Sequence, residues 1–169
     1  MMKNANFRSF FSKGVGCLLV SFVVSAVAGE GQSSVSPVNP ATSPTGIWQT
    51  LDETTHLSSS LIAIKEHQGE WVGTVIQICH PTENHAVYRC DRCKDDRAHQ
   101  PVIGMEVVRH MRYLKPGFYG KGTVLDPRNG HVYKAQMRLK EQGSQLDLRG
   151  YILMPWIGKT ARWYRRSHC

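Results

Sequence analysis

Long apolar runs are scarce in this sequence of 169 residues, which has only one of them, at the N-terminus. A bundle of membrane helices is therefore excluded. The sequence also has no internal repeat with a period of about 20 to 50 residues, which excludes solenoid and collagen-like arrays. The hydrophobic fraction of 41% is too high for a chain that is disordered throughout, and the length fits one domain.

Familiar catalytic motifs are missing as well. The sequence contains no Gly-x-Ser-x-Gly, no His-Glu-x-x-His and no glycine-rich phosphate loop. Asp126 precedes Pro127 in a turn, so we expect its carboxylate to bond turn amides rather than to act as an acid. We therefore predict a protein that is not an enzyme and carries no cofactor.

Residues 1–28 are predicted to be a signal peptide. Three basic residues and no acid precede an uncharged run over residues 15–28, which is too short to span a bilayer comfortably. The run ends in Ala26-Val27-Ala28, the small-x-small pattern that signal peptidase recognises. An uncleaved membrane anchor is the alternative. We expect cleavage after Ala28 and hence a periplasmic or secreted protein without a membrane span.

Cleavage would remove three basic residues and lower the formal net charge from +8 to +5. A weak attraction to anionic cell-surface polymers is compatible with this charge. The sequence contains no nucleic-acid-binding module, so we expect no nucleic-acid partner. Residues 29–45 are rich in Gly, Ser, Pro and Thr and offer few apolar groups, so we predict a disordered linker there.

From Gly46 onward, the sequence alternates with the period of two that is typical of half-buried strands. Residues 132–140 are the clearest case. One predicted face consists of Tyr133, Ala135, Met137 and Leu139, and the other of Val132, Lys134, Gln136, Arg138 and Lys140. Further strands are predicted over 46–51, 60–67, 70–78, 102–111, 118–125, 145–153 and 160–166.

The connections between these segments are mostly short and turn-like, as in His67-Gln68-Gly69-Glu70 and Asp126-Pro127-Arg128-Asn129-Gly130. Eight strands joined by tight turns predict an antiparallel up-and-down meander. Closing that meander removes both sheet edges, which favours a small all-β barrel over an open sheet. A two-sheet sandwich with long crossovers is the alternative.

Several motifs of residues 46–166, taken in order, resemble a family of small exported bacterial proteins known as domain of unknown function 2147. They are Gly46-Ile47-Trp48, Cys90-Asp91-Arg92-Cys93, Pro101-Val102-Ile103-Gly104-Met105, Tyr119-Gly120-Lys121-Gly122-Thr123-Val124-Leu125-Asp126-Pro127, Asn129-Gly130-His131-Val132-Tyr133, Arg149-Gly150-Tyr151 and Trp163-Tyr164-Arg165. The sequence departs from the family pattern at Lys121, where glycine is usual, and in having Cys79 and Cys169.

The resemblance implies a lipocalin-like barrel with no established activity. In lipocalins, a Gly-x-Trp on the first strand meets an Arg of the last strand, whose guanidinium covers the indole and closes one barrel end. Trp48 and Arg165 occupy similar places here, so the resemblance implies a cation–π contact between them. The alternative is that Trp48 is an ordinary core residue and Arg165 a solvated charge.

Four cysteines remain after cleavage, and Cys90 and Cys93 lie in a long loop between Cys79 and Pro101. Export favours a disulfide, while structural zinc with His80, His85 or His99, a redox-active dithiol and free thiols are the alternatives. The family resemblance supplies the pair Cys90–Cys93. Its competitor is Cys79–Cys93, and the pairing of Cys79 and Cys169 stays open.

We therefore hypothesise an exported, non-catalytic binding module that holds a small apolar or amphipathic ligand in an eight-stranded barrel. A barrel of this size either is filled by its own side chains or holds one small ligand. A structural or envelope-interaction protein with a filled barrel is the alternative. A thiol redox or zinc protein that uses Cys90 and Cys93 is the third hypothesis.

Overall fold

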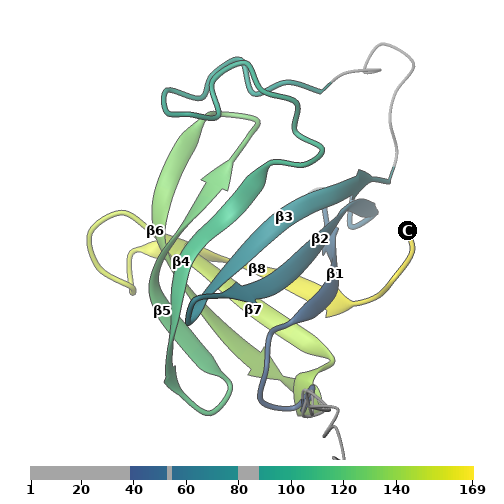
Figure 1. The fold of residues 1–169 in the computed structure, drawn as a ribbon, viewed down its shortest axis with the longest axis vertical. Coiled ribbons are helices and arrows are strands. Elements are labelled where there is room, and N and C mark those ends of the chain that lie inside the picture. The colour runs from purple at the N-terminus through teal and green to yellow at the C-terminus, as the bar shows by residue number, and fades with distance from the viewer. Residues whose placement is uncertain (1–38, 53–54, 80–87) are drawn as a thin grey trace, which may run out of the picture. The chain divides into compact units, whose positions relative to one another are not determined.

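The computed structural model describes residues 39–52, 55–79 and 88–169. Eight antiparallel strands, paired in chain order, form one closed barrel (Figure 1). The strands are β1 (Gly46–Leu51), β2 (Ser58–His67), β3 (Glu70–Ile78), β4 (Glu106–Lys115), β5 (Phe118–Asp126), β6 (His131–Lys140), β7 (Gln145–Tyr151) and β8 (Gly158–Arg165). A short 3₁₀ turn, η1 (Glu141–Gly143), joins β6 to β7. The predicted up-and-down barrel is confirmed.

Alternation of side chains sets the inside and the outside of this barrel. In β6, Ala135 and Met137 are fully buried, whereas Lys134 and Arg138 are exposed. The pairing of β6 with β7 runs without a register shift from Lys134 to Lys140, so every second residue of this stretch faces the interior.

Tight turns connect most of the strands, as their sequences predict. Gly117, between β4 and β5, has a φ of +67°, and Gly130, between β5 and β6, has a φ of +72°. Both angles lie in the left-handed region that glycine enters without a steric penalty. These turns bring consecutive strands side by side and leave no strand edge open.

Several predicted strand boundaries differ from the structure by one or more residues, and for two strands the local structure gives the reason. The strand predicted over 102–111 begins only at Glu106 and continues to Lys115. Residues 102–105 instead form a turn in which Gly104 has a φ of +89°, and the amide of Gly104 donates to the carbonyl of Val75. The strand predicted over 145–153 ends at Tyr151, because the chain leaves the β7–β8 ladder there.

The linker predicted over 29–45 also differs in its last part. Residues 39–45 cross one end of the barrel as an ordered segment, which we call the strap, and Pro44 within it is fully buried. Its order comes from hydrogen bonds to distant strands, which composition does not reveal. The remainder of the predicted linker and the predicted signal peptide lie outside the described residues. Within the described residues, no helix has the length and apolar character needed to cross a membrane.

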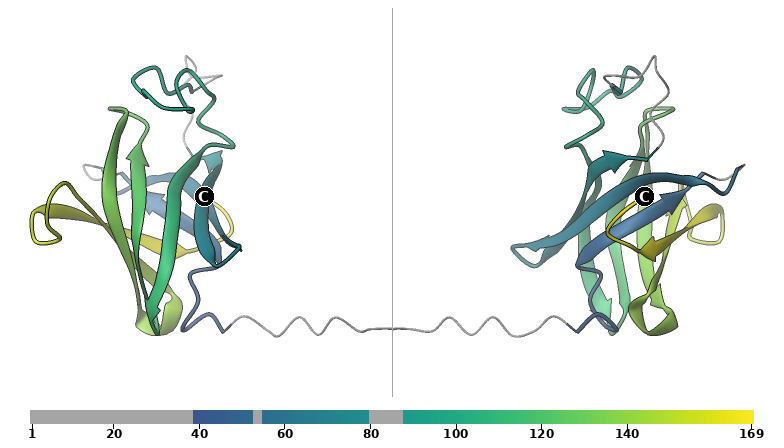
Figure 2. Two further views of the ribbon diagram at one scale, coloured as in Figure 1. Left: turned by 60° about the vertical axis from the view of Figure 1, so that its left-hand side comes forward. Right: turned by 90° about the vertical axis from the view of Figure 1, so that its right-hand side faces the viewer.

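The two ends of the barrel are covered differently. The strap, η1 and the β4–β5 turn lie at the lower end in Figure 1, and the loop before β4 rises above the upper end. A third feature, the loop between β7 and β8, projects sideways from the wall, as both views of Figure 2 show.

Candidate functional site

The strap end is closed by Trp48 and Arg165, which the structure brings together. The guanidinium carbon of Arg165 lies 4.3 Å from the ring centroid of Trp48. The same guanidinium donates hydrogen bonds to four backbone carbonyls, those of Thr45 at 2.7 Å, Gly143 at 2.8 Å, Ser43 at 3.0 Å and Pro40 at 3.4 Å. Arg165 therefore ties β8 to both the strap and η1.

Indole and phenol groups hold the strap from the barrel side. The Trp48 indole donates to the carbonyl of Pro44 at 2.7 Å, and the Trp71 indole donates to the Thr45 hydroxyl at 3.2 Å. The Tyr119 hydroxyl donates to the carbonyl of Thr42 at 2.6 Å. The strap is thus part of the folded domain and supplies polar backbone to an end that is otherwise aromatic.

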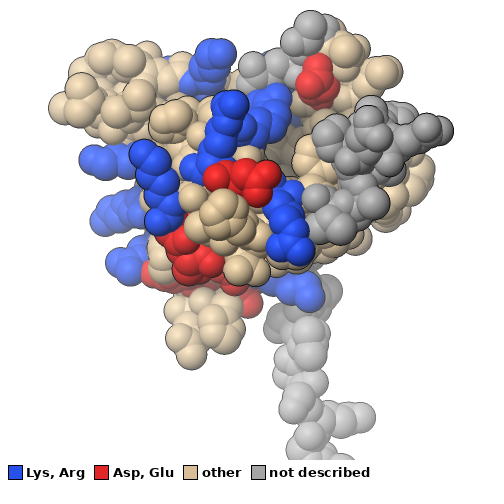
Figure 3. Space-filling model, turned by 90° about the horizontal axis from the view of Figure 1, so that it is seen from above, with Lys and Arg blue, Asp and Glu red and all other residues tan. Residues whose placement is uncertain are grey.

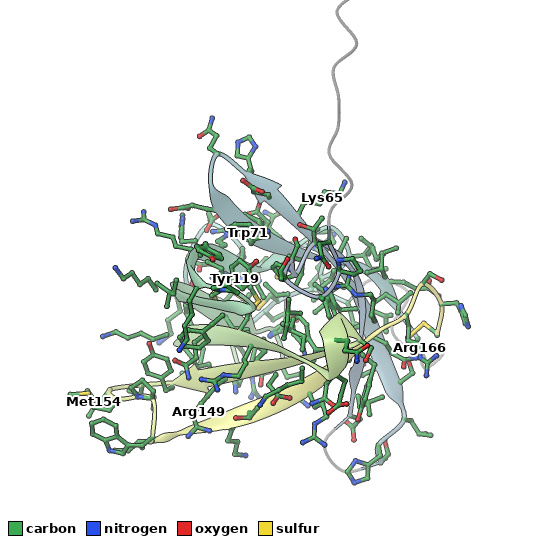
Figure 4. All side chains as sticks on the ribbon, turned by 90° about the horizontal axis from the view of Figure 1, so that it is seen from below. Lys65, Trp71, Tyr119, Arg149, Met154 and Arg166 are labelled. Carbon is green, nitrogen blue, oxygen red and sulfur yellow. A yellow bond between two sulfur atoms is a disulfide. The ribbon has the colours of Figure 1, made fainter. Side chains whose placement is uncertain are left out.

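A hollow of about 440 Å³ opens beside the strap. It is lined by Asn39, Thr42, Ser43, Glu66, Trp71, Tyr113, Pro116 and Tyr119. We call it the strap hollow. Tyr119 packs edge-on against Trp71, with ring centroids 4.7 Å apart, and against Tyr113 at 5.8 Å. Figure 4 shows Trp71 and Tyr119 next to each other at this end.

Electrostatics in the strap hollow are set by one acid. Glu66 stands opposite Trp71 in the β2–β3 register, and among the described residues no cation forms an ion pair with it. Burial raises the pKa of Tyr119 to about 12, and neighbouring Tyr113 and Glu66 contribute to the rise. Tyr119 is therefore a neutral hydrogen-bond donor at physiological pH.

The barrel interior is occupied by the protein's own side chains. Interior glycines show how little space is left: a Cβ added to Gly73 would lie 3.0 Å from Cβ of Val108, and one added to Gly122 would lie 2.8 Å from Sδ of Met111. These distances are shorter than a normal carbon contact, so neighbouring side chains already fill the room that the glycines leave. No buried side-chain nitrogen or oxygen of the described residues lacks a hydrogen-bond partner.

The opposite end is covered by residues 88–105, which we call the lid. Cys90 and Cys93 lie in it at disulfide distance, with Cα atoms 5.4 Å apart, and both side chains are buried within the hydrophobic core. The Cys90 sulfur also contacts the carbonyl of Pro127 in the β5–β6 turn, at 3.4 Å. Cys90 and Cys93 therefore pack inward, as part of the lid, and do not face solvent.

Ion pairs fix the rest of the lid. Buried Arg97 forms an ion pair with Asp95 and donates to the carbonyl of Glu106 at 2.8 Å. Hydrogen bonds from Arg97 lower the pKa of Asp95 to about 2. Asp96 accepts two hydrogen bonds, each of 2.9 Å, from Arg109 of β4. These contacts anchor the lid to the barrel wall.

Cys79 and Cys169, whose pairing the sequence left open, lie at disulfide distance from each other, with Cα atoms 5.4 Å apart. The competing pair Cys79–Cys93 is absent from the structure. His80 and His85 lie outside the described residues. Among those described, no group of three or more His, Cys, Asp or Glu side chains is placed to hold a metal ion.

A second hollow, of about 580 Å³, lies on the outer wall between the β2–β3 turn and β4. Glu70 is its central acid and accepts hydrogen bonds from Arg112 at 2.9 Å and shares one of 2.8 Å with His110. His110 and Arg112 lower the pKa of Glu70. An acid held ionised by two partners is poorly suited to proton transfer.

The most exposed apolar segment of the described residues was missed by the sequence analysis. In the β7–β8 loop, Ile152, Leu153, Met154, Trp156 and Ile157 are between 49% and 73% exposed. The signal was present as an apolar run between Tyr151 and Gly158, but a strand was predicted to continue into it. Arg149 holds the loop, since it donates to the carbonyls of Pro155 and Trp156 and to the Thr160 hydroxyl.

Comparisons with known proteins agree with this architecture. Protein HP1028 from the human pathogen Helicobacter pylori, described as belonging to the lipocalin family, has a similar structure with a TM-score of 0.62 and 19% sequence identity. The match covers 75% of this chain and 84% of HP1028. No curated protein matches the sequence closely enough to count as a relative. Residues 46–165 match the family described as uncharacterized proteins conserved in bacteria, DUF2147, and the chain belongs to that family.

Proposed function

We propose that this protein is an exported, non-catalytic binding protein that takes one small amphipathic ligand at the strap hollow. The main support for the proposal is that the open space lies at the strap hollow and not inside the barrel. Side chains fill the barrel interior at the levels of Gly73 and Gly122, whereas the strap hollow is open to solvent. Its volume of about 440 Å³ is in the range of small-molecule sites.

The lining of the strap hollow favours an organic cation with a short apolar group. Aromatic rings attract cations through the negative charge on their faces, and a nearby carboxylate strengthens that preference. Tyr113 supplies an exposed ring, which packs on the buried ring of Tyr119, and exposed Glu66 supplies the carboxylate. The hydroxyl of Tyr119 and the indole nitrogen of Trp71 are bonded to the strap, and both rings are buried. Tyr113, which is 53% exposed, is therefore the ring that offers its surface to a ligand.

Export is part of the same proposal. Both cysteine pairs lie at disulfide distance, which is typical of proteins that fold in an oxidising compartment. With cleavage after Ala28, the mature protein would begin at Gly29. N-terminal sequencing of the exported protein tests this directly, and an intact Met1 would contradict it.

Binding is tested by isothermal titration with butyltrimethylammonium as a cationic probe and butyrate as its anionic counterpart. We expect measurable affinity for the cation alone. Tyr113→Ala and Glu66→Gln should each weaken it by about tenfold, the loss expected for one cation–π or charge contact. Tyr164→Ala is the matched control, because Tyr164 lies on β8 and does not line the strap hollow. Unchanged affinity in Tyr113→Ala would rule out the strap hollow as the site.

An envelope-interaction protein with a filled barrel is the second candidate. It is favoured by a different observation, the exposed apolar β7–β8 loop. Native mass spectrometry of protein purified from its own host separates the two candidates. A retained small molecule supports ligand binding, and a bare polypeptide mass supports the interaction protein.

A further inference from the structure

The β7–β8 loop presents a continuous apolar surface to solvent. Single exposed apolar residues are normal, but five large ones within six positions form a patch, and such patches mark interaction sites. Trp156 is 73% exposed, whereas Trp48, Trp71 and Trp163 are all buried. One tryptophan is therefore placed where an apolar partner would contact it.

The loop keeps this shape through its own contacts. The β7–β8 ladder runs up to the pair Tyr151–Gly158, and the amide of Ile157 donates to the carbonyl of Met154 at 2.9 Å. Arg149 adds hydrogen bonds to two loop carbonyls, as described above. Figure 4 shows Met154 at the outer end of the loop and Arg149 nearer the barrel. The apolar tip is thus preorganised and needs little ordering on binding.

Basic residues lie at the base of the loop. Lys159 is exposed and lies opposite Gly150 in the β7–β8 register, one position before Tyr151. Lys134 is exposed and lies opposite Tyr151 in the β6–β7 register. Figure 3 shows Lys and Arg side chains along the flank from which this loop projects in Figure 1. The loop therefore combines an apolar tip with a basic collar.

We propose that the β7–β8 loop docks the protein on a lipid bilayer that contains anionic lipids. An apolar tip with a tryptophan enters the interfacial layer, where the indole ring is favoured, and basic residues behind it meet the anionic headgroups. The long stems of Lys and Arg allow both contacts at once.

Size and shape favour this occupant over a protein partner. A stable protein–protein interface needs roughly 20 to 30 residues on each side, many more than one projecting loop of six residues provides. A bilayer needs no shape complementarity, because its lipids rearrange around an inserted tip. The basic collar complements anionic lipids specifically, so charge adds to apolar insertion.

Vesicle sedimentation tests the proposal on the full mature protein. We expect cosedimentation with phosphatidylglycerol vesicles, weaker cosedimentation with phosphatidylcholine vesicles, and a loss of binding as salt rises, since exposed charges are screened. Trp156 emission should shift to shorter wavelength on binding, because the indole leaves water. Absence of wild-type cosedimentation with phosphatidylglycerol vesicles would overturn the proposal.

Variants locate the contact. Trp156→Ser should weaken binding to phosphatidylglycerol vesicles by about tenfold or more, because it removes the largest apolar group of the tip. The matched control is Leu57→Ser, an apolar residue of comparable exposure (59%) in the β1–β2 loop. Lys134→Gln should reduce binding to phosphatidylglycerol but not to phosphatidylcholine. Equal losses in Trp156→Ser and Leu57→Ser would contradict the proposed contact.

A second copy of the chain is the competing occupant. Analytical ultracentrifugation of wild type and Trp156→Ser distinguishes it, because a dimer that dissociates in the variant would overturn lipid docking in favour of self-association. Thermal unfolding of each variant serves as the folding control, and exposed loop substitutions should leave it nearly unchanged.

Discussion

Among single residues, Arg165 makes many of the contacts that close the strap end. It stacks on Trp48 and donates to carbonyls of the strap and of η1. Removal of its side chain would leave these carbonyls without their donor and uncover a buried indole. The strap hollow depends on the same contacts, since residues 39, 42 and 43 form part of its lining.

Arg165→Ala should therefore lower the free energy of unfolding by about 2–4 kcal/mol, from several charge-assisted hydrogen bonds and one shielded cation–π contact. Arg165→Lys, which keeps the charge but loses the planar fork, should give a smaller loss. Arg138→Ala is the control, because Arg138 lies 5.0 Å from the Phe118 ring but is exposed, and should cost below about 1 kcal/mol. Equal urea midpoints for Arg165→Ala and Arg138→Ala would contradict this role.

Sequence reasoning reached some residues of the strap end and not others. Trp48 and Arg165 stood out because a family resemblance pairs them across the first and last strands. Lys121 stood out as a departure from glycine, and it has a φ of +62°, a conformation that favours glycine. The strap hollow could not be predicted, because Glu66, Trp71 and Tyr119 come from β2, β3 and β5 and meet only through the register of the closed barrel.

Among the elements, strands with one solvated face were predictable, because the alternation of apolar and polar residues indicates which side chains face inward. β6 is the clearest example, with inward Met137 next to outward Arg138. The start of β4 was not predictable, since Val102 and Met105 are buried as strand residues would be, yet belong to the lid. The β7–β8 loop was missed because an apolar run normally indicates burial, and here it is exposed.

The two cysteine pairs should contribute very differently to stability. Cys79–Cys169 joins residues 90 apart in the sequence, whereas Cys90–Cys93 joins residues 3 apart. By chain entropy, the long loop stabilises by about 4–5 kcal/mol and the short one by about 2 kcal/mol. Cys79→Ser with Cys169→Ser should therefore lower the unfolding midpoint more than Cys90→Ser with Cys93→Ser.

Peptide mapping of the non-reduced wild-type protein accompanies this comparison and should recover both pairs. A peptide linking Cys79 to Cys90 or Cys93 would contradict the pairing. A larger loss in the Cys90/Cys93 double variant would show instead that packing of the lid, where both sulfurs are buried, outweighs chain entropy.

For the whole molecule, we propose that the filled barrel is a scaffold and that binding takes place on its outside, at the strap hollow and at the β7–β8 loop. The NMR signals of methionine methyl groups can distinguish these regions, because the methionines lie in different parts of the molecule. Met111 and Met137 are fully buried in the interior, Met105 is buried in the lid, and Met154 is 49% exposed in the loop.

The most direct test is methionine-methyl NMR during titration with laurate, a probe whose chain suits an apolar lumen. We predict that the methyl signals of Met111 and Met137 keep their positions throughout the titration, because both side chains are fully buried in the packed core. Saturable shifts of both signals would place the ligand inside the barrel and contradict the account.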